Sequence, residues 1–469
     1  MIRFENFSFS YGDLRNPQIR NFDFTIETGQ CVLLCGASAC GKTTAAKCIN
    51  GLIPHFTEGN MTGAVWLDDK KISDIPSYVL SQHIGSVFQN PKTQFFNLDS
   101  SSELVFGMEN LGVPSEEMHR RVKQVAEELE IQDLLGRNVF ALSGGEKQLL
   151  ALASVYAMDP DVYVLDEPTA NMDAQSIAHL IKILRKLKQA GKTIVISEHR
   201  LYFLMGLVDK AILIEHGAVK EIFTGERFRT IPDIDRCKMG LRCFQYPEQQ
   251  PAIPLETPEG LLQIQNLSVK IGKQQILQNV SFSADTGDII AVTGGNGSGK
   301  TTLLRTLCGL VQEKSGTVTY DGRAYSAKKR RALCAMTMQD VAHQLFGDSV
   351  EAEFSLLNCE ISKEQIDAIL QTLHLQEFRS HHPMTLSGGQ KQRLAIAAAS
   401  LSGKQIMVFD EPTSGLDYGN MCQVSQLIQT LAANRIVFIA THDRELVNQL
   451  CTKELSLDNG KAHLVKYTV

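Results

Sequence analysis

The chain has 469 residues, of which 43% are hydrophobic and 21% charged, and its formal net charge is −6. This length suits two or more globular domains, and the composition is typical of folded chains. The negative balance argues against a protein that wraps nucleic acid, because such binding needs excess Lys and Arg. No apolar run reaches the roughly 18 residues of a membrane span, and we see no signal-peptide layout. We therefore expect any membrane role to come through a partner.

Both halves of the chain begin with the same predicted series of elements. Short β-like segments come first, a glycine-rich loop and a helix follow, and two apolar strands lie beyond a long insertion. Strands that alternate with helices predict a parallel sheet covered on both faces, so the expected fold class is α/β. The predicted strands lie at 4–11, 22–26, 31–34, 162–165 and 193–197, then at 262–269, 280–282, 289–292, 406–409 and 436–440, and the helices at 43–50 and 301–310.

Five motifs recur in one order and at nearly one spacing, which indicates an internal duplication. They are a glycine-rich loop, a glutamine, a Leu-Ser-Gly-Gly turn, an Asp-Glu pair after an apolar strand, and a histidine. We expect a first domain at 1–225, a linker or appendage at 226–260 and a second domain at 261–469. The motif pairs begin at Gly36 and Gly294, Gln89 and Gln339, Leu142 and Leu386, Asp166 and Asp410, and His199 and His442.

The segment between the halves has a distinct composition. Residues 245–260 contain four prolines, which exclude a regular helix and predict a semi-extended linker. The basic segment 227–243 before it is interpreted as a surface appendage of the first half. The 11 cysteines are an odd number without zinc spacing, and they predict reduced thiols. Cys237 and Cys243 leave a redox pair in the appendage as an alternative.

Each glycine-rich loop matches the phosphate-binding pattern G-x-x-x-x-G-K-[ST]. It follows a strand and opens a helix, where backbone N–H groups and the helix dipole favour an anion. Lys42 and Lys300 are expected to reach the β- and γ-phosphates, and Thr43 and Thr301 to place a hydroxyl on Mg²⁺. The candidate loop residues are Gly36, Ala37, Ser38, Ala39, Cys40, Gly41, Lys42, Thr43 and Thr44, and Gly294, Gly295, Asn296, Gly297, Ser298, Gly299, Lys300, Thr301 and Thr302.

An acidic pair ends an apolar strand in each half. Asp166 and Asp410 stand where a carboxylate holds Mg²⁺ through water. Glu167 and Glu411 come next, and adjacent residues at a strand end point in different directions. The second carboxylate can therefore face an attacking water, so we assign the glutamates as general base or water-positioning group. The alternative is a pair of solvated acids at a strand end.

The Leu-Ser-Gly-Gly turns precede strong helix formers in both halves. A serine at that position can cap the helix and present N–H groups to an anion. An ordinary capped helix is the alternative. The turn residues are Ser143, Gly144 and Gly145, and Ser387, Gly388 and Gly389.

This order of motifs resembles the ATP-binding cassette (ABC) ATPases over nearly the whole chain, twice. The resemblance implies two tandem P-loop NTPase domains, each with a RecA-like parallel-sheet core, a small antiparallel β subdomain and a helical subdomain. It also implies that the halves pair head to tail, with ATP and Mg²⁺ between one phosphate loop and the opposite Leu-Ser-Gly-Gly turn, and with both histidines on the γ-phosphate. One composite site then joins Lys42, Thr43, Gln89, Asp166, Glu167 and His199 with Ser387, Gly388 and Gly389, and the other joins Lys300, Thr301, Gln339, Asp410, Glu411 and His442 with Ser143, Gly144 and Gly145. The implied metal-binding residues are Thr43, Gln89, Asp166, Thr301, Gln339 and Asp410.

The two predicted sites differ in places. Tyr11 matches the family aromatic that stacks on adenine, whereas Ile271 stands at the equivalent position and predicts weaker nucleotide binding there. The segment after the glutamate reads Pro-Thr-Ala-Asn-Met-Asp in the first half and Pro-Thr-Ser-Gly-Leu-Asp in the second. Both glutamates are present, so neither site is marked as inactive. The neighbours of the histidine also differ, and they are Glu198 and Arg200 in the first half and Thr441 and Asp443 in the second.

The segments after the two glutamines share the pattern Gln-x₄-Gln-x-Phe, and an acid follows in each, Glu103 and Glu353. This form resembles the ATPases of energy-coupling factor (ECF) transporters, which import vitamins and metal ions. The resemblance implies a transmembrane coupling subunit and a membrane substrate-binding subunit as partners, and a place at the cytoplasmic face of the membrane. The alternative for Phe95, Phe96 and Phe346 is that they are core residues of the helical subdomain.

Two other functions stay open. A fused sugar-importer ATPase is one, although it is not expected to carry this pattern in both halves. A soluble two-cassette protein acting on ribosomes or DNA is the other, although a short Pro-rich linker and a negative charge disfavour it, and we expect no nucleic-acid partner. The transported substrate cannot be identified, because a separate subunit selects it in such systems.

Overall fold

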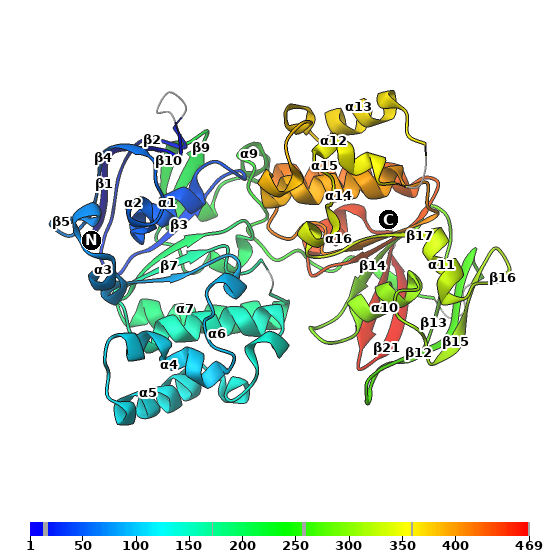
Figure 1. Cartoon of the computed structure of the whole chain (residues 1–469), viewed down its shortest axis with the longest axis horizontal. Helices are drawn as coiled ribbons and strands as arrows, with labels where there is room; N and C mark the ends of the chain where they lie inside the picture. Colours follow the sequence, from blue (N-terminus) through cyan, green and yellow to red (C-terminus); the bar gives the residue numbers. More distant parts are fainter. Residues whose placement is uncertain (13–16, 171, 256–258, 358–359, 468–469) are drawn as a thin grey trace. The chain divides into compact units, whose positions relative to one another are not determined.

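The computed structural model describes residues 1–12, 17–170, 172–255, 259–357 and 360–467, and the chain divides into two compact units, Met1–Tyr246 and Pro247–Val469 (Figure 1). Each unit contains a parallel-sheet core, antiparallel strands and a group of helices, so the predicted fold class is confirmed. None of the helices in the described ranges is long and apolar enough to cross a membrane.

The first unit has a ten-stranded sheet with the order β5-β4-β1-β2-β10-β9-β3-β8-β7-β6. Strands β9, β3, β8, β7 and β6 form its parallel part, and β5, β4, β1 and β2 form an antiparallel subdomain. The strands are β1 (Ile2–Ser10), β2 (Ile19–Ile26), β3 (Cys31–Cys35), β4 (Asn60–Leu67), β5 (Lys70–Lys71), β6 (Ile84–Val87), β7 (Val162–Asp166), β8 (Thr193–Ser197), β9 (Lys210–Glu215) and β10 (Ala218–Thr224). The helices are α1 (Lys42–Ile49), α2 (Leu52–His55), α3 (Ser77–His83), α4 (Ser100–Asn110), α5 (Ser115–Glu128), α6 (Gly144–Ala157), α7 (Ala174–Gln189), α8 (Gly225–Arg229) and α9 (Asp233–Lys238).

The second unit repeats this plan with its antiparallel strands in a separate sheet. The orders are β11-β21-β20-β14-β19-β18-β17 and β13-β12-β15-β16. The strands are β11 (Ala252–Pro254), β12 (Leu262–Ile271), β13 (Gln274–Ala284), β14 (Ile289–Thr293), β15 (Ser315–Tyr320), β16 (Arg323–Ala324), β17 (Cys334–Thr337), β18 (Ile406–Asp410), β19 (Ile436–Ala440), β20 (Lys453–Asp458) and β21 (Lys461–Tyr467). The helices are α10 (Lys300–Leu307), α11 (Ala327–Leu333), α12 (Val350–Ser355), α13 (Lys363–Thr372), α14 (Gly388–Leu401), α15 (Tyr418–Ala432) and α16 (Arg444–Leu450).

The segment between the halves is partly incorporated into both units. Phe228 and Leu241 are buried in the core of the first unit, so the predicted appendage contributes to that core rather than only covering it. Cys237 and Cys243 are half-buried thiols there. The Pro-rich segment contributes β11, which pairs with β21, while its residues 256–258 lie outside the described residues.

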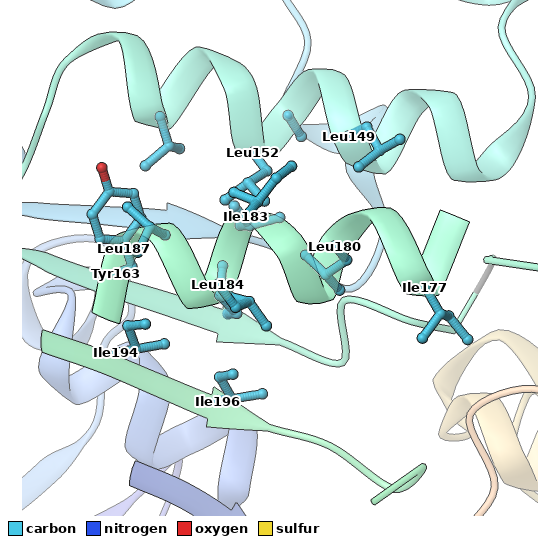
Figure 2. Close-up of a cluster of buried hydrophobic side chains, with 14 of the residues drawn as sticks. Leu149, Leu152, Tyr163, Ile177, Leu180, Ile183, Leu184, Leu187, Ile194 and Ile196 are labelled. Carbon is cyan, nitrogen blue, oxygen red and sulfur yellow. The ribbon is translucent and has the colours of Figure 1, made fainter. Parts of the chain in front are cut away.

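Helix α7 shows why these sequences form layered units. Its apolar residues recur every three or four positions, so they form one face of a helix. That face packs against side chains of α6 and of the strands β7 and β8, where the residues are buried (Figure 2). The contacting side chains include Ile177, Leu180, Ile183, Leu184 and Leu187 from α7, Leu149 and Leu152 from α6, Tyr163 from β7, and Ile194 and Ile196 from β8.

The parallel strands bring the predicted motifs to one edge of each core. β3 ends just before the first phosphate loop, β7 ends at Asp166, and β8 ends just before Glu198. The second unit matches this with β14, β18 and β19. Ligands of open α/β sheets bind outside the carboxyl ends of the strands, so this edge is the candidate site in each unit.

Candidate functional site

The first phosphate loop is held in a conformation that suits an anion. Gly36 and Gly41 adopt φ values of 138° and 111°, and a Cβ on Gly36 would lie 2.1 Å from the Ile214 carbonyl oxygen. Lys42 is buried, and its Nζ donates to the carbonyl oxygens of Gly36 at 3.0 Å and Ala37 at 2.8 Å. The ammonium group therefore lies inside the turn, where glycine lets the backbone approach a phosphate closely.

The second phosphate loop has the same geometry. Lys300 Nζ donates to the carbonyl oxygens of Gly294 at 2.8 Å and Gly295 at 3.0 Å. A Cβ on Gly294 would lie 2.4 Å from the Leu457 carbonyl oxygen, so the close approach again requires glycine. Ser298 Oγ is buried and has no hydrogen-bond partner among the described residues. A buried hydroxyl without a partner in a glycine-rich loop can donate a hydrogen bond to a phosphate oxygen, so it fits a phosphate-binding loop.

In each unit, a threonine and an aspartate predicted to hold Mg²⁺ come together. Thr43 Oγ1 donates to Asp166 Oδ1 at 3.2 Å, and Thr301 Oγ1 donates to Asp410 Oδ2 at 3.0 Å. Hydroxyl and carboxylate oxygens are ligands that Mg²⁺ prefers, so this donor set fits the ion. When bound with ATP, the ion neutralises negative charge that develops on the phosphates. A pocket of about 270 Å³ borders Thr43, Asp166 and Gln89.

Burial dominates the electrostatics of the two aspartates. Desolvation raises the pKa of Asp166, and the nearby Glu167 charge adds to this, whereas hydrogen bonds from Ser197 and Thr43 oppose it. Ser197 Oγ donates to Asp166 Oδ1 at 2.6 Å. Desolvation likewise raises the pKa of Asp410, against the hydrogen bond from Thr301. Such carboxylates gain from a cation, because a positive charge compensates the cost of burying a negative one.

Glu167 has the contacts expected of a buried base. Gln89 Nε2 donates to its Oε2 at 2.6 Å, and His199 Nε2 lies 3.4 Å from its Oε1. Burial raises the pKa of Glu167, but the charge and hydrogen bond of His199, with Lys42 and Gln89, outweigh this and hold the pKa below its ordinary value. Glu167 is therefore ionised at neutral pH, as a group that accepts a proton from water must be.

Glu411 occupies the corresponding place in the second unit with different neighbours. His442 Nε2 lies 3.8 Å from its Oε1, and Thr441 Oγ1 donates to its Oε2 at 3.3 Å. Both glutamates have left-handed backbones, with φ of 46° at Glu167 and 52° at Glu411. Non-glycine residues rarely adopt this conformation, and such strain clusters at active sites. The repeated strain argues against simple solvated acids at a strand end.

The Leu-Ser-Gly-Gly turns begin α6 and α14, as predicted. Ser143 Oγ accepts from the Glu146 backbone N–H at 3.3 Å, and Glu146 Oε2 accepts from the Ser143 N–H at 2.7 Å. Ser387 and Gln390 form the same reciprocal cap. These bonds use the serine oxygens as acceptors, so the hydroxyl hydrogens can still be donated to an anion. Pairing of each turn with the opposite phosphate loop stays a prediction.

The two positions predicted to contact adenine carry different side chains. Tyr11 is 48% exposed, its OH lies 3.2 Å from Thr44 Oγ1, and its ring packs edge-on against Phe9. Ile271 is 53% exposed in the second unit. An aromatic side chain therefore lies beside the first phosphate loop, whereas the equivalent position of the second unit carries an exposed aliphatic side chain. Contact of either side chain with adenine stays a prediction.

The structure assigns roles to the glutamine-rich segments that the pattern alone does not show. Gln94 accepts from the Phe88 N–H at 3.3 Å and donates to the Ser86 carbonyl at 2.8 Å, so it ties the segment after Gln89 to β6. Gln344 makes the same pair of bonds, with Met338 at 2.7 Å and Met336 at 2.9 Å. The second glutamine of each pattern therefore braces the loop, in that its side chain holds the backbone by two hydrogen bonds. In the sequence, the only sign of this role is that the glutamine recurs at the same spacing in both halves.

The acids after these segments also brace the backbone. Glu103 Oε2 accepts from the N–H groups of Phe96 at 3.1 Å and Asn97 at 2.8 Å. Glu353 Oε2 accepts from Phe346 at 2.9 Å and Gly347 at 2.7 Å. The braced phenylalanines point outward, with exposures of 74% for Phe96 and 76% for Phe346, so the core interpretation is wrong for both. Phe95 does pack against the core of the first unit.

Comparison with known proteins places the chain in a family. The ABC transporter family matches residues 19–170 and 277–414. An ABC transporter ATP-binding protein of Treponema denticola is 45% identical, with 98% of this chain and 96% of the relative covered. An HMP/thiamine import ATP-binding protein of Bacillus subtilis is 33% identical, with 98% and 91% covered.

The solved structures agree on the fold. A structure titled RNase-L Inhibitor matches with a TM-score of 0.65 at 19% identity, covering 98% of this chain and 90% of that one. An archaeal ribosome recycling factor in complex with a stalk protein matches with a TM-score of 0.64 at 20% identity, covering 95% and 87%. At such identities the likeness concerns the fold alone. The chain belongs to the ABC transporter family, and it is a two-cassette, ATP-hydrolysing ATP-binding subunit of a transporter.

Proposed function

We propose that this chain energises an ECF-type importer of a vitamin or metal ion, through two composite ATP sites that its halves complete for each other. The observation that carries the proposal is the braced Gln-x₄-Gln-x-Phe segment, which both units contain. In the first unit the segment joins Gln89, which contacts Glu167, to the exposed Phe96. The second unit has the same glutamine brace at Gln344 and an exposed Phe346.

The first unit shows how such a link would work. Gln89 contacts Glu167 at 2.6 Å, Gln94 bonds to the backbone just before Gln89, and Phe96 is exposed two residues after Gln94. A change in the position of Gln89 on ATP binding would therefore reach Phe96 through a short, hydrogen-bonded segment. The ring of Phe96 stacks on the ring of Phe106 in α4, with the ring centroids 4.7 Å apart. This stacking limits the rotation of the Phe96 side chain.

The surface around Phe96 is suited to an apolar partner. Contiguous patches of exposed apolar side chains commonly mark interaction sites on protein surfaces. The second unit also has exposed apolar side chains in its helical part. The exposed side chains are Phe96, Leu98 and Phe140 in the first unit, and Phe346, Leu356 and Met384 in the second. We infer that they receive a transmembrane coupling subunit, which holds the chain at the membrane beside a substrate-binding subunit.

The Bacillus subtilis relative supports a vitamin among the possible substrates. It is named for HMP/thiamine import, and it aligns with nearly the whole of this chain. Substrate choice would lie in the membrane subunit, as in the ECF importers that this chain resembles. ATP binding would close the two halves, and hydrolysis would reopen them.

The test is to isolate the tagged chain from mild-detergent extracts of its own cells and identify what co-purifies. A small substrate-binding membrane protein together with a coupling protein is the expected result. Phe96→Ser with Phe346→Ser should lose both partners while ATP binding remains, and Tyr78→Ser, at another exposed aromatic, is the matched control. Sugar-importer permeases or ribosomes in place of these proteins would contradict the ECF assignment.

A further inference from the structure

The loops that carry the two site histidines place a buried acid on opposite sides of the histidine. Glu198 directly precedes His199, whereas Asp443 directly follows His442. Both acids are buried, with exposures of 3% and 4%. Because they stand at different positions in the repeat, aligning the two halves does not pair them.

Glu198 satisfies four donors. Its Oε2 accepts from Thr169 Oγ1 at 2.9 Å and from the Thr169 N–H at 3.2 Å. Its Oε1 accepts from the backbone N–H groups of His199 at 2.9 Å and Arg200 at 3.1 Å. One carboxylate thus ties the segment after Glu167 to the backbone of the histidine loop.

Asp443 makes the corresponding tie in the second unit. Its Oδ2 accepts from Thr413 Oγ1 at 2.8 Å, and its Oδ1 accepts from the Leu446 N–H at 3.3 Å at the start of α16. Thr413 follows Glu411 by two positions, as Thr169 follows Glu167. In each half, a carboxylate therefore anchors the histidine loop to the equivalent threonine. The carboxylate precedes the histidine in the first half and follows it in the second.

The geometry points to Glu198 as the positioning residue of the first site, which holds Thr169 and the His199 loop in place of the aspartate that the second site uses. This inference rests on the proposed hydrolysis at the first site. With Glu198 removed, the N–H groups of Thr169, His199 and Arg200 lose a buried acceptor, which costs more than a solvated bond would. His199 would then be held less well against Glu167.

The surroundings of Glu198 support this position. Burial raises the pKa of Glu198, and the charge of Glu167 adds to the rise. Arg200, which stands where Asp443 stands in the second unit, instead donates from Nη1 to the Met172 carbonyl at 3.3 Å. The two loops thus differ on both sides of the histidine. This is expected if the acid has moved from the position after the histidine to the position before it.

Transposing the acid tests the inference. In the Glu411→Gln full chain, where Glu167 is the remaining base, Glu198→Thr should lower kcat about tenfold with the KM for ATP within about twofold, since each tenfold corresponds to 1.36 kcal/mol in the barrier. If that background has no turnover, the same change is made in the natural chain, with at least a twofold fall in kcat expected. Adding Arg200→Asp creates the Thr-His-Asp order of the second loop and should restore kcat to within about threefold.

The mirror pair in the second half is the matched control. Asp443→Arg alone should lower kcat, and Thr441→Glu with Asp443→Arg should restore it. Natural turnover in Glu198→Thr, or no restoration by the added aspartate in a folded chain, overturns the inference. If neither first-half variant folds, the mirror pair decides in the same way. If the chain proves not to energise an ECF-type importer, the kcat values of these variants do not change. Failure of the proposed function can therefore be distinguished from failure of this inference.

Discussion

The catalytic assignment rests most directly on the two strained glutamates. Glu167→Gln should lower ATP turnover by at least about hundredfold at its site, because general bases contribute 10² to 10⁴ in rate. Fluorescent-nucleotide binding should persist, since Lys42 and the loop glycines are intact. The double variant with Glu411→Gln is measured by phosphate release. Turnover at the natural rate in the double variant would exclude these roles.

The exchange of aromatic and aliphatic residues at the adenine positions gives a second residue-scale prediction. Ile271→Tyr should tighten nucleotide binding at the second site by about two- to tenfold, because an aromatic contact contributes about 0.5–1.5 kcal/mol. Titration with a fluorescent ATP analogue in a Lys42→Ala background isolates that site. Tyr11→Ile with Lys300→Ala is the reciprocal measurement. An unchanged dissociation constant in both would remove the stacking argument.

Ala39 illustrates strain that the sequence does not reveal. It adopts a φ of 62° in the first phosphate loop, where the second loop has Gly297 at 77°. Ala39→Gly should raise the unfolding temperature of its unit slightly, and Gly297→Ala should lower the unfolding free energy by about 1 kcal/mol, because left-handed backbone costs L-residues about 1–2 kcal/mol. Differential scanning calorimetry measures both, and equal curves for all three chains would contradict this account.

At the scale of elements, the braced segments make the link between site and surface. Gln94→Leu keeps the side-chain size but removes both backbone bonds, so amide exchange over residues 88–96 should accelerate about tenfold, in line with the roughly 1.4 kcal/mol of such a loss. Mass spectrometry of deuterium uptake follows it. Gln124→Leu, which removes an exposed bond to Glu128 on α5, should leave that segment unchanged. Equal uptake in both variants would show that Gln94 is no brace.

The elements themselves were largely predictable, because local signals specify them. The strands 193–197 and 436–440 match β8 and β19 at both ends, and the predicted serines, Ser143 and Ser387, cap α6 and α14. Other predicted strands are shorter than observed at one or both ends, as β13 shows, because pairing with β12 extends it into polar residues. The roles of Gln94 and Glu103 depend on how the backbone folds back within eight residues, and the role of Glu198 depends on its contact with Thr169, 29 residues away. Periodicity shows neither kind of contact. Residue 171 of the switch segment lies outside the described residues.

At the scale of the whole molecule, duplication within one chain explains why the sites can differ. Linking two domains makes their pairing intramolecular, with an effective concentration set by the linker. The residues around one site can then change while the other half keeps its own. Tyr11 and Ile271 differ in this way, as do Glu198 and Asp443. The prediction that belongs to this scale is that each half supplies a serine-glycine turn to the other.

A cryo-electron microscopy structure of the Glu167→Gln, Glu411→Gln chain with ATP and Mg²⁺ tests that claim most directly. We predict that Ser387 Oγ lies within hydrogen-bonding distance, about 3 Å, of the nucleotide held by Lys42, and that Ser143 does the same at Lys300. Nucleotide bound at both loops with the serines tens of ångströms away would contradict the account.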